Sequence, residues 1–493
     1  MLEPSRLRIY NTLTRQKEEF VPLVAGEVKM YVCGPTVYGF LHVGNFRGPI
    51  FFNLVRNWLE NNGYKVSFAY NYTDVDDKII HRAQEENTTS SAISEKYIAE
   101  FEHDFKTLKL KAHTHNPKVT DNMGPIVDTI QTLVGNGSAY VAADGEVLYS
   151  VRGFAGYGKL SGKNLDDLQA GARVEVDKKK RDPMDFALWK PAKPGEPKWP
   201  SPWCEGRPGW HIECSAMVAQ LFGASIDIHG GGSDLIFPHH ENEIAQSEGA
   251  TAKPFAKYWM HNNMLTFGDK KMSKSLGNIK SGREFLNEYN AEIFKFMILS
   301  VHYRSLSDFS QQGVDFAITG LARFYSALNL AAKTIEAARD LSTAAAAPQS
   351  FAASVASADV AIANALNDDF NTPEMFAAMY TVVRQFNALI RLGQKPTPET
   401  LKVATDFKAW VLAQGELLSL FSESPGEYLR LLDDMLLKQK SLERAKIDQL
   451  VLERTQVRTE KNFKRSDELR DELVHLGIAL QDTAAGTFWE VAK

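Results

Sequence analysis

Apolar and polar positions near the N-terminus of the chain follow the pattern of a β-loop-α-β unit. Lys29 to Cys33 is a short β-prone run, and Gly34-Pro35-Thr36 then interrupts it. From Gly48 to Asn61 apolar residues recur at helical spacing, and Tyr64 to Tyr70 is again strand-like. The pattern therefore predicts an α/β fold that begins with a doubly wound parallel sheet.

Further along the chain the pattern changes three times. Short strand-like pieces between about Gly137 and Trp199, before the α/β pattern resumes at Ile226 to His229, predict an inserted subdomain. After Ile293 long helical periodicity dominates, which predicts a helical domain. The tail from Leu431 to Leu473 alternates charged and apolar residues and ends in a hairpin-like stretch, Gly477 to Trp489, which predicts a small C-terminal α/β module.

Composition narrows the class of protein. At 493 residues the chain is long enough for roughly three domains, and its net charge of −5 means that any RNA contact must use local basic patches. Three cysteines, Cys33, Cys204 and Cys214, are too few for a secreted disulfide scaffold and favour reduced thiols or metal ligands. No apolar leader is present at the start and no stretch reaches the ~18 apolar residues of a membrane span, so we expect a cytoplasmic protein without membrane association.

Two loops carry groups that can bind phosphates. His42-Val43-Gly44-Asn45 lies between the first strand and the first helix, where helix N-terminal amides and polar side chains can hold phosphate oxygens. Lys271-Met272-Ser273-Lys274-Ser275 contains two ammonium groups and two hydroxyls, and such a loop can neutralise charge as pyrophosphate departs. Either motif alone is more often a solvated loop. Their order, with an α/β region between them, favours a nucleotide site.

Four residues with metal-binding side chains come from three parts of the chain: Cys33, Cys214, His239 and Glu243. His239 and Glu243 stand four apart after Pro238, which suits the first turn of a helix, so both side chains face one way. Two thiolates, an imidazole and a carboxylate are a ligand set that zinc accepts. Buried cysteine is often an inert hydrophobe and a His-Glu pair is often a polar helix face, so the spacing alone leaves a zinc site and a structural cluster equally open. A zinc-protease site is excluded, because His240-Glu241-Asn242-Glu243-Ile244 lacks the second histidine of His-Glu-x-x-His.

The two loops closely resemble the signatures of class I aminoacyl-tRNA synthetases, His-Ile-Gly-His and Lys-Met-Ser-Lys-Ser. The second signature matches in full, and the first departs at Val43 and Asn45, although an asparagine amide can still donate a hydrogen bond to a phosphate oxygen. Gly209 to Met217 and Phe237 to Glu243 resemble segments of the cysteinyl-tRNA synthetase family. The resemblance runs from about Leu7 to Trp489. It implies a ligase that activates L-cysteine with ATP and transfers it to tRNA(Cys), with one Zn²⁺ per chain that recognises the cysteine thiolate and Mg²⁺ that accompanies ATP.

The resemblance also assigns roles to individual positions. It implies zinc ligands at Cys33, Cys214, His239 and Glu243, and catalytic residues at His42, Asn45, Lys271 and Lys274. It implies cysteine-binding residues at Thr36, Thr73 and Trp210, and ATP-binding residues at His42, Gly44, Gly230, Gly232, Asp234 and Lys274. Cys204 matches no family position and is expected to be a bystander.

Domain boundaries follow from the pattern and the resemblance together. We expect a Rossmann-like catalytic domain in two halves, 1–136 and 205–264, separated by an inserted connective subdomain at 137–204. Residues 265–320 would form the signature-loop and tRNA stem-contact region, 321–425 a helical tRNA-binding domain, and 426–493 a C-terminal anticodon-binding module. In the helical domain Thr372 is expected to cap a helix whose first position is Pro373. In the last module Arg454, Arg458, Lys464 and Arg465 are either phosphate contacts or parts of a solvated helix face.

Two other functions remain open at this stage. A cysteine ligase of the same fold that acylates a small sugar amine would use the same signatures, but such ligases largely lack the long helical and terminal regions. An inactive paralogue that only binds RNA predicts loss of the lysine signature or of the metal ligands, and both are intact here. By resemblance to the family, a monomer is expected.

Overall fold

The computed structural model describes residues 5–165, 179–267, 270–271, 281–341, 345–483 and 486–493. Its central feature is a four-stranded parallel sheet with the strand order β10-β9-β3-β4. The strands are β3 (Glu27–Val32), β4 (Lys65–Tyr70), β9 (Ile226–Gly232) and β10 (Ala256–Asn262). Helix α1 (Arg47–Asn61) connects β3 to β4. The predicted doubly wound α/β fold and its first β-loop-α-β unit are confirmed.

Shorter elements surround this sheet. Before and beside it lie β1 (Arg8–Asn11), β2 (Gln16–Glu19), the 3₁₀ turn η1 (Val43–Phe46), α2 (Asp77–Glu85), α3 (Ser90–Thr107) and η2 (Thr120–Asn122). Around β9 lie α6 (Trp210–Phe222), the turns η4 (Ser233–Leu235) and η5 (Ile236–His240), and α7 (Glu241–Thr251). The α6 and α7 helices pack with α4 (Met123–Gly135) and the strands of the insertion in one hydrophobic cluster.

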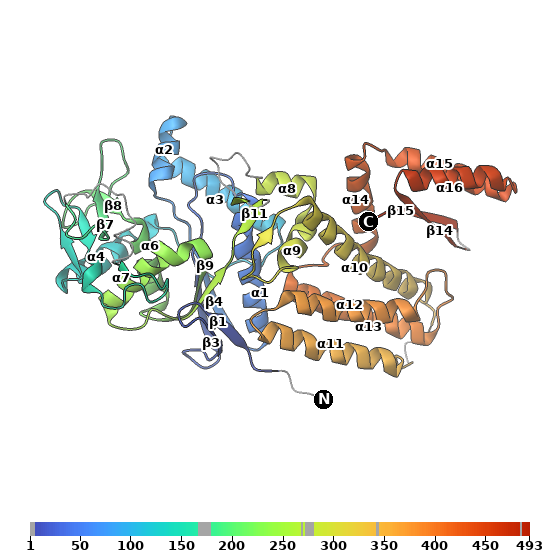
Figure 1. Cartoon of the computed structure of the whole chain (residues 1–493), viewed down its shortest axis with the longest axis horizontal. Helices are drawn as coiled ribbons and strands as arrows, with labels where there is room; N and C mark the ends of the chain where they lie inside the picture. Colours follow the sequence, from blue (N-terminus) through green and yellow to red (C-terminus); the bar gives the residue numbers. More distant parts are fainter. Residues whose placement is uncertain (1–4, 166–178, 268–269, 272–280, 342–344, 484–485) are drawn as a thin grey trace.

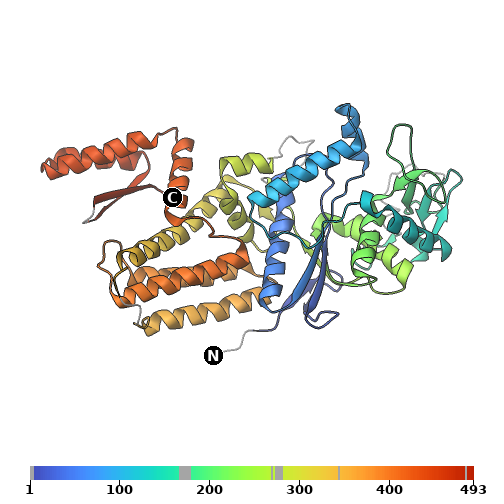
Figure 2. The same ribbon diagram turned by 180° about the vertical axis from the view of Figure 1, so that it is seen from behind.

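A second sheet confirms the inserted subdomain. It is antiparallel, in the order β5-β6-β7-β8, with strands β5 (Ala139–Val141), β6 (Val147–Tyr149), β7 (Phe186–Pro191) and β8 (Gly206–Pro208). Helix α4 (Met123–Gly135) precedes it and η3 (Val151–Gly153) follows β6. The subdomain and the helical domain lie on opposite sides of the parallel sheet (Figures 1 and 2).

The second half of the chain is helical, as expected. After the short strands β11 (Leu265–Phe267), β12 (Lys270–Lys271) and β13 (Ser307–Asp308) and the helices α8 (Gly282–Glu288) and α9 (Ala291–Leu299), four long helices pack together: α10 (Gln311–Ala337), α11 (Gln349–Asn367), α12 (Thr372–Leu389) and α13 (Pro398–Leu418). The cap of α12 differs from the prediction, because Asn371 caps the helix and Thr372 is its first residue. Asparagine and threonine side chains can both accept a hydrogen bond from a backbone N–H at the start of a helix. The sequence alone therefore did not decide which of the two neighbours caps α12.

Asp369, just before α12, joins the helical domain to the catalytic half. Its carboxylate is fully buried and accepts hydrogen bonds from the Tyr10 backbone N–H (2.8 Å), the Tyr303 hydroxyl (2.7 Å) and Arg304 Nε (2.7 Å). These donors come from the N-terminal strand β1 and from the loop after α9. The segment that contains Asp369 therefore has a structural role.

The C-terminal module has a small hydrophobic core of its own, built from Leu437, Ile447, Val451, Leu473, Ile478 and Val491. Three helices, α14 (Pro425–Gln439), α15 (Arg444–Thr459) and α16 (Phe463–His475), precede the predicted hairpin, β14 (Ile478–Thr483) and β15 (Gly486–Val491). Arg454 is 5% exposed and forms a two-pronged ion pair with Asp482 at 2.9 Å, and Arg458 binds the same carboxylate at 2.5 Å. These two cations therefore hold the module together. No described helix is long and apolar enough to cross a bilayer.

Arg47 at the start of α1 is the largest buried cation near the sheet. It is 1% exposed, and its guanidinium donates to four backbone carbonyls, Asn263 (2.9 Å), Met264 (2.8 Å), His302 (3.2 Å) and Ser305 (2.6 Å). Burial lowers the pKa of Arg47 to about 10, so it stays charged at neutral pH. One side chain thus ties the loops after β10 and α9 to helix α1.

Replacing Arg47 with methionine should therefore lower the free energy of unfolding by roughly 3 kcal/mol or more, because it strands several buried carbonyls without donors. The shift of the urea midpoint, followed by circular dichroism, measures the effect. Arg6→Met removes an exposed arginine and serves as the matched control. Equal midpoints for the two variants would contradict the expected role of Arg47.

Candidate active site and metal centre

Folding brings the four predicted metal ligands together in the interior. Cys33 Sγ lies 3.7 Å from Cys214 Sγ, 3.5 Å from His239 Nε2 and 3.4 Å from Glu243 Oε1, and His239 Nε2 lies 3.0 Å from Glu243 Oε1. All four ligand atoms lie within 4.8 Å of one another, and all four residues are buried. Tetrahedral zinc with bonds of ~2.0–2.3 Å implies ligand separations of roughly 3.3–3.8 Å. The donor set and its spacing fit a zinc ion.

Each ligand is positioned by a different structural device. Cys33 directly follows β3, at the carboxyl end of a parallel strand, where open α/β sheets bind their ligands. Cys214 lies in the second turn of α6, which packs against α7. His239 is the next-to-last residue of the turn η5 and Glu243 lies in the first turn of α7, so the helical spacing read from the sequence does place both side chains on one face.

The site is electrostatically arranged to hold negative sulfur. The hydrogen bond from the Cys33 thiol lowers the pKa of Cys214 to about 6, although burial acts in the opposite direction. Burial raises the pKa of Cys33 well above its usual value. Against its own burial, the charges of His229 and His239 hold the pKa of Glu243 well below the usual range. Neighbouring groups thus favour the charged forms of Cys214 and Glu243, whereas burial favours the neutral thiol of Cys33.

A shell of histidines orients the ligands. His229 Nε2 lies 2.8 Å from Glu243 Oε2, and His211 Nδ1 lies 3.0 Å from His239 Nδ1. Partners of this kind fix the ring orientation and tautomer of a metal ligand. Sequence reasoning missed both residues as parts of the site. The sequence did contain a signal for each residue. His229 lies in the carboxyl-terminal half of a predicted strand, and His211 lies next to Trp210 in the segment that ends at Cys214.

Trp210 is not a core residue. Its side chain is 40% exposed, and its ring stacks on the His239 ring with a centroid distance of 4.3 Å and an interplanar angle of 17°. It therefore forms an apolar surface directly beside the metal cluster.

A cavity of about 400 Å³ opens from this surface and reaches the first signature. Among the predicted residues, its lining contains Cys33, Thr36, His42, Gly44, Asn45, Trp210, Gly232 and Asp234. The metal side and the phosphate side of the predicted site therefore share one cavity. Lys78 also lines it and was not predicted.

Among the described residues predicted to bind cysteine or ATP, two do not line this cavity. Thr73 is 2% exposed, pairs with Thr36 through the backbone, and its hydroxyl lies 3.4 Å from Glu213 Oε2. Gly230 lies in β9, where an added Cβ would come within 2.3 Å of the Phe52 ring. The missing side chain at Gly230 is thus required by packing against α1.

The first signature forms a rigid turn. Asn45 Oδ1 accepts a hydrogen bond from the His42 backbone N–H at 3.0 Å, and the turn η1 leads directly into α1. Asn45, where the sequence departs from the family signature, therefore stabilises the turn that leads into α1.

Of the second signature, the structure describes only the first residue, Lys271. Lys271 ends β12 and its side chain is not described, while Lys274 and the rest of the motif lie outside the described residues. The chain re-enters the described part at Ser281, which pairs with His42 in a β-bridge, and the Gly282 N–H donates to Leu41 O at 2.9 Å. The chain that follows the second signature therefore returns to the first. Cys204 lies away from the cluster, with its Sγ 3.4 Å from Gly145 O.

Comparisons with known proteins agree with this arrangement. Residues 19–319 match the family model described as tRNA synthetases class I (C) catalytic domain, and residues 361–422 match the DALR domain. A cysteine–tRNA ligase of Bdellovibrio bacteriovorus is 58% identical over 99% of this chain and 100% of its own length, and that of Geobacter sulfurreducens is 46% identical over 98% and 99%.

Among solved structures, methionyl-tRNA synthetase of Mycobacterium tuberculosis in complex with methionyl-adenylate shares the fold. The TM-score is 0.63 at 14% identity, with coverage of 83% of this chain and 94% of the other. Sequence identity over nearly the whole length, rather than this shared fold, decides the family. The chain belongs to the cysteine–tRNA ligase family of class I tRNA synthetases.

Proposed function

We propose that this enzyme activates L-cysteine with ATP to form cysteinyl-adenylate and then transfers the cysteinyl group to the 3′ end of tRNA(Cys). The observation that supports this most directly is the buried Cys33, Cys214, His239 and Glu243 cluster, of which Cys33 lines a cavity that also reaches the first signature loop. Cysteine recognition and phosphate chemistry thus share a single space.

The amino-acid end of the cavity selects the side chain. Cys33, Cys214, His239 and Glu243 would hold one Zn²⁺, which when bound prefers a substrate thiolate to a hydroxyl. Trp210 supplies an apolar surface beside the cluster, and Thr36 lines the same pocket. Thr73 supports that wall from behind through its backbone pairing with Thr36. Apolar contacts alone discriminate near-isosteres by only ~10², so the donor cluster carries the selection against serine.

The phosphate end of the cavity positions ATP. Gly44 and Gly232 leave the backbone open to close approach, and His42 and Asn45 lie on the rim of the same cavity. Gly230 and Asp234 are assigned to the adenosine side by the family resemblance, Gly230 as backbone only. Mg²⁺ would accompany ATP.

The reaction needs positioning and charge stabilisation more than a protein nucleophile. A cysteine carboxylate oxygen attacks the α-phosphorus and pyrophosphate leaves. A terminal ribose hydroxyl of tRNA then attacks the carbonyl carbon of the adenylate, and AMP leaves. Lys271 and Lys274 of the second signature neutralise the charge that develops on the departing pyrophosphate, and His42 binds the phosphates.

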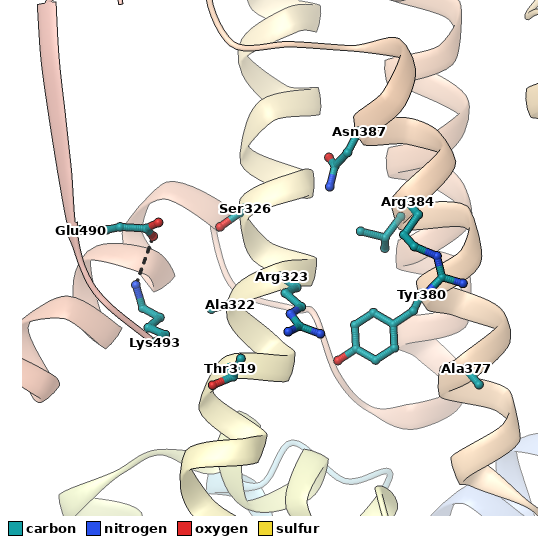
Figure 3. Close-up of a pocket in the computed structure, with 11 residues that line it drawn as sticks. Thr319, Ala322, Arg323, Ser326, Ala377, Tyr380, Arg384, Asn387, Glu490 and Lys493 are labelled. Atoms are coloured by element: carbon teal, nitrogen blue, oxygen red, sulfur yellow. Dashed lines mark hydrogen bonds and ion pairs between the residues drawn. The ribbon is translucent and has the colours of Figure 1, made fainter. Parts of the chain in front are cut away.

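The tRNA partner would extend along the helical half of the molecule. A cavity of about 710 Å³ lies between α10, α12 and the C-terminal residues, and Figure 3 shows Arg323, Tyr380 and Arg384 turned into it. Neither arginine forms an ion pair with a carboxylate of the described residues, in contrast to Arg454 and Arg458. The cavity supports the assignment of 321–425 to tRNA binding and of 426–493 to the anticodon. The monomeric state and the cytoplasmic location stay predictions.

Cysteine-dependent ATP/pyrophosphate exchange tests this function, with serine as the control substrate and the zinc content measured on the same sample. We expect exchange with cysteine only, about one zinc per chain, and charging when tRNA(Cys) is added. Exchange without charging would favour a ligase for a small amine acceptor. No exchange in zinc-loaded protein would leave only an RNA-binding paralogue.

A further inference from the structure

A groove of about 540 Å³ lies beside the active-site cavity, and we call it the entry groove. It is lined by the segment that precedes the first signature and by residues of the helices α2 and α3. Tyr38, Gly39, Phe40 and Lys78 line both the entry groove and the active-site cavity. The two spaces therefore adjoin, and a long ligand in the groove can reach into the cavity.

Phe40 gives the entry groove an exposed aromatic wall. It is 53% exposed, although the Tyr97 ring meets its ring edge to face at a centroid distance of 5.5 Å and the Arg283 guanidinium lies over the ring at 5.3 Å. Arg283 is in turn fixed by Asp104 Oδ1, which accepts a hydrogen bond from it at 2.6 Å. A single exposed apolar side chain is ordinary, but a ring held by two neighbours in the wall of a groove is a preformed surface on which a flat ligand can stack.

Lys78 gives the entry groove a positive charge where it meets the active-site cavity. The two carboxylates that line the groove have cationic partners, because Asp77 accepts a hydrogen bond from Arg207 and Glu85 Oε2 lies 4.0 Å from Arg82 Nη1. Lys78 is exposed and forms no ion pair within the part of the chain that the structure describes. Its ammonium is therefore free to bind an anionic group of a ligand.

We propose that the entry groove binds the single-stranded 3′ end of tRNA, with one base stacked on Phe40 and one backbone phosphate bound by Lys78. Single strands are held in this way, by aromatic side chains that stack on bases and by cations that follow the backbone. Lys78 Nζ lies 5.5 Å from the Tyr38 ring centroid, so a cation and an aromatic ring stand together at the junction with the cavity. The inference rests on the proposed function, in which a terminal ribose hydroxyl must reach the adenylate.

The test measures the affinity of wild type and Phe40→Ala for two RNAs at one fixed salt concentration. The first is full-length tRNA(Cys), and the second is the same tRNA without its last three nucleotides. Wild type should bind the full-length tRNA about 5-fold or more tightly than the shortened one, which is the scale of one base stacked on an aromatic ring. Phe40→Ala should bind the two RNAs nearly equally, and Phe40→Trp, which keeps an aromatic face, should restore the difference.

Leu23→Ala is the matched control for the loss of an exposed apolar side chain. Leu23 is 47% exposed and precedes β3, at the amino end of the parallel strands and away from the groove. This variant should keep the wild-type difference between the two RNAs. Charging kinetics give a second readout, in which Phe40→Ala should lower kcat/KM for tRNA about 5-fold more than it lowers ATP/pyrophosphate exchange, a reaction that needs no tRNA.

The salt dependence of binding tests the phosphate contact. Lys78→Gln should weaken the binding of full-length tRNA and reduce the slope of log affinity against log salt by about 0.7, the share of one phosphate contact on a single strand. The slope for the shortened tRNA should not change. Lys253→Gln, which removes an exposed lysine after α7, should leave both slopes as in wild type.

Two results would overturn the inference while the proposed function stands. The first is wild-type enzyme that charges tRNA(Cys) but binds the full-length and the shortened tRNA equally. The second is a full wild-type difference between the two RNAs in Phe40→Ala together with an unchanged salt slope in Lys78→Gln. Wild-type enzyme that exchanges pyrophosphate with cysteine but never charges tRNA would instead reject the proposed tRNA ligase, and the inference with it.

Discussion

Cys214→Ser should abolish stable zinc binding and reduce cysteine-dependent ATP/pyrophosphate exchange by more than ~100-fold, since the loss of a direct ligand exceeds the 10- to 100-fold cost typical of outer partners. Cys214 is 2% exposed, its thiol has a pKa of about 6, and its sulfur lies 3.7 Å from Cys33 Sγ. Serine is nearly isosteric, but its hydroxyl stays protonated at neutral pH and is a poor zinc ligand. Metal analysis per chain and the exchange rate measure the two effects.

The remaining cysteine provides the matched control. Cys204 sits outside the cluster, against Gly145 O. Cys204→Ser should therefore retain one zinc per chain and a wild-type exchange rate. Full zinc occupancy in Cys214→Ser, or an equal loss of zinc in the two variants, would show that the buried cluster is not the metal centre.

Lys274→Ala should slow cysteinyl-adenylate formation by ~10² or more while leaving the zinc content intact, the usual scale for removing one electrostatic stabiliser of a transition state. The reason is the charge that moves onto pyrophosphate as it departs. Although Lys274 lies outside the described residues, the chain that follows it returns to His42 through the Ser281 β-bridge. Ser281, where the described part of the chain resumes, therefore lies beside the phosphate end of the cavity.

The measurement is pyrophosphate exchange at saturating ATP and cysteine. Lys253→Ala removes a solvent-exposed lysine after α7 and controls for the change in net charge. Lys274→Arg keeps the positive charge and should recover part of the rate. An exchange rate for Lys274→Ala close to that of Lys253→Ala would refute the proposed role of this lysine.

Together these two substitutions separate the halves of the cavity. Cys214→Ser removes cysteine recognition through the metal, whereas Lys274→Ala removes charge stabilisation with the metal still bound. Zinc analysis distinguishes them even where both lose exchange.

Local sequence patterns predicted the elements that frame the site. The β3-α1-β4 unit follows from apolar spacing and from the break at Gly34-Pro35-Thr36, and the orientation of His239 and Glu243 follows from helical periodicity. Such patterns are reliable because they depend on neighbours within a few residues. They are less reliable where two neighbours are chemically equivalent, as with the cap of α12, which is Asn371 in place of the expected Thr372.

Pairing between distant side chains was beyond the reach of these patterns. Arg454 looked like one of several surface cations, and only the folded hairpin brings Asp482 to it. Gly230 looked like a ligand-binding glycine, and only the packing of α1 shows that the Phe52 ring takes the space of its missing side chain. In both cases the deciding partner lies far away in sequence.

By itself, the sequence determined the family, the order of the domains and the identity of the four candidate ligands, because motif residues and hydrophobic periodicity are local properties of the chain. The tertiary structure alone decided that Cys33, Cys214, His239 and Glu243 meet within 4.8 Å, that Trp210 stacks on His239, and that one cavity reaches from Cys33 and Trp210 to the first signature. It also placed His211 and His229 against the ligands His239 and Glu243. These contacts join strand and helix ends that lie far apart along the chain, and close packing of α6 and α7 against the sheet sets their distances.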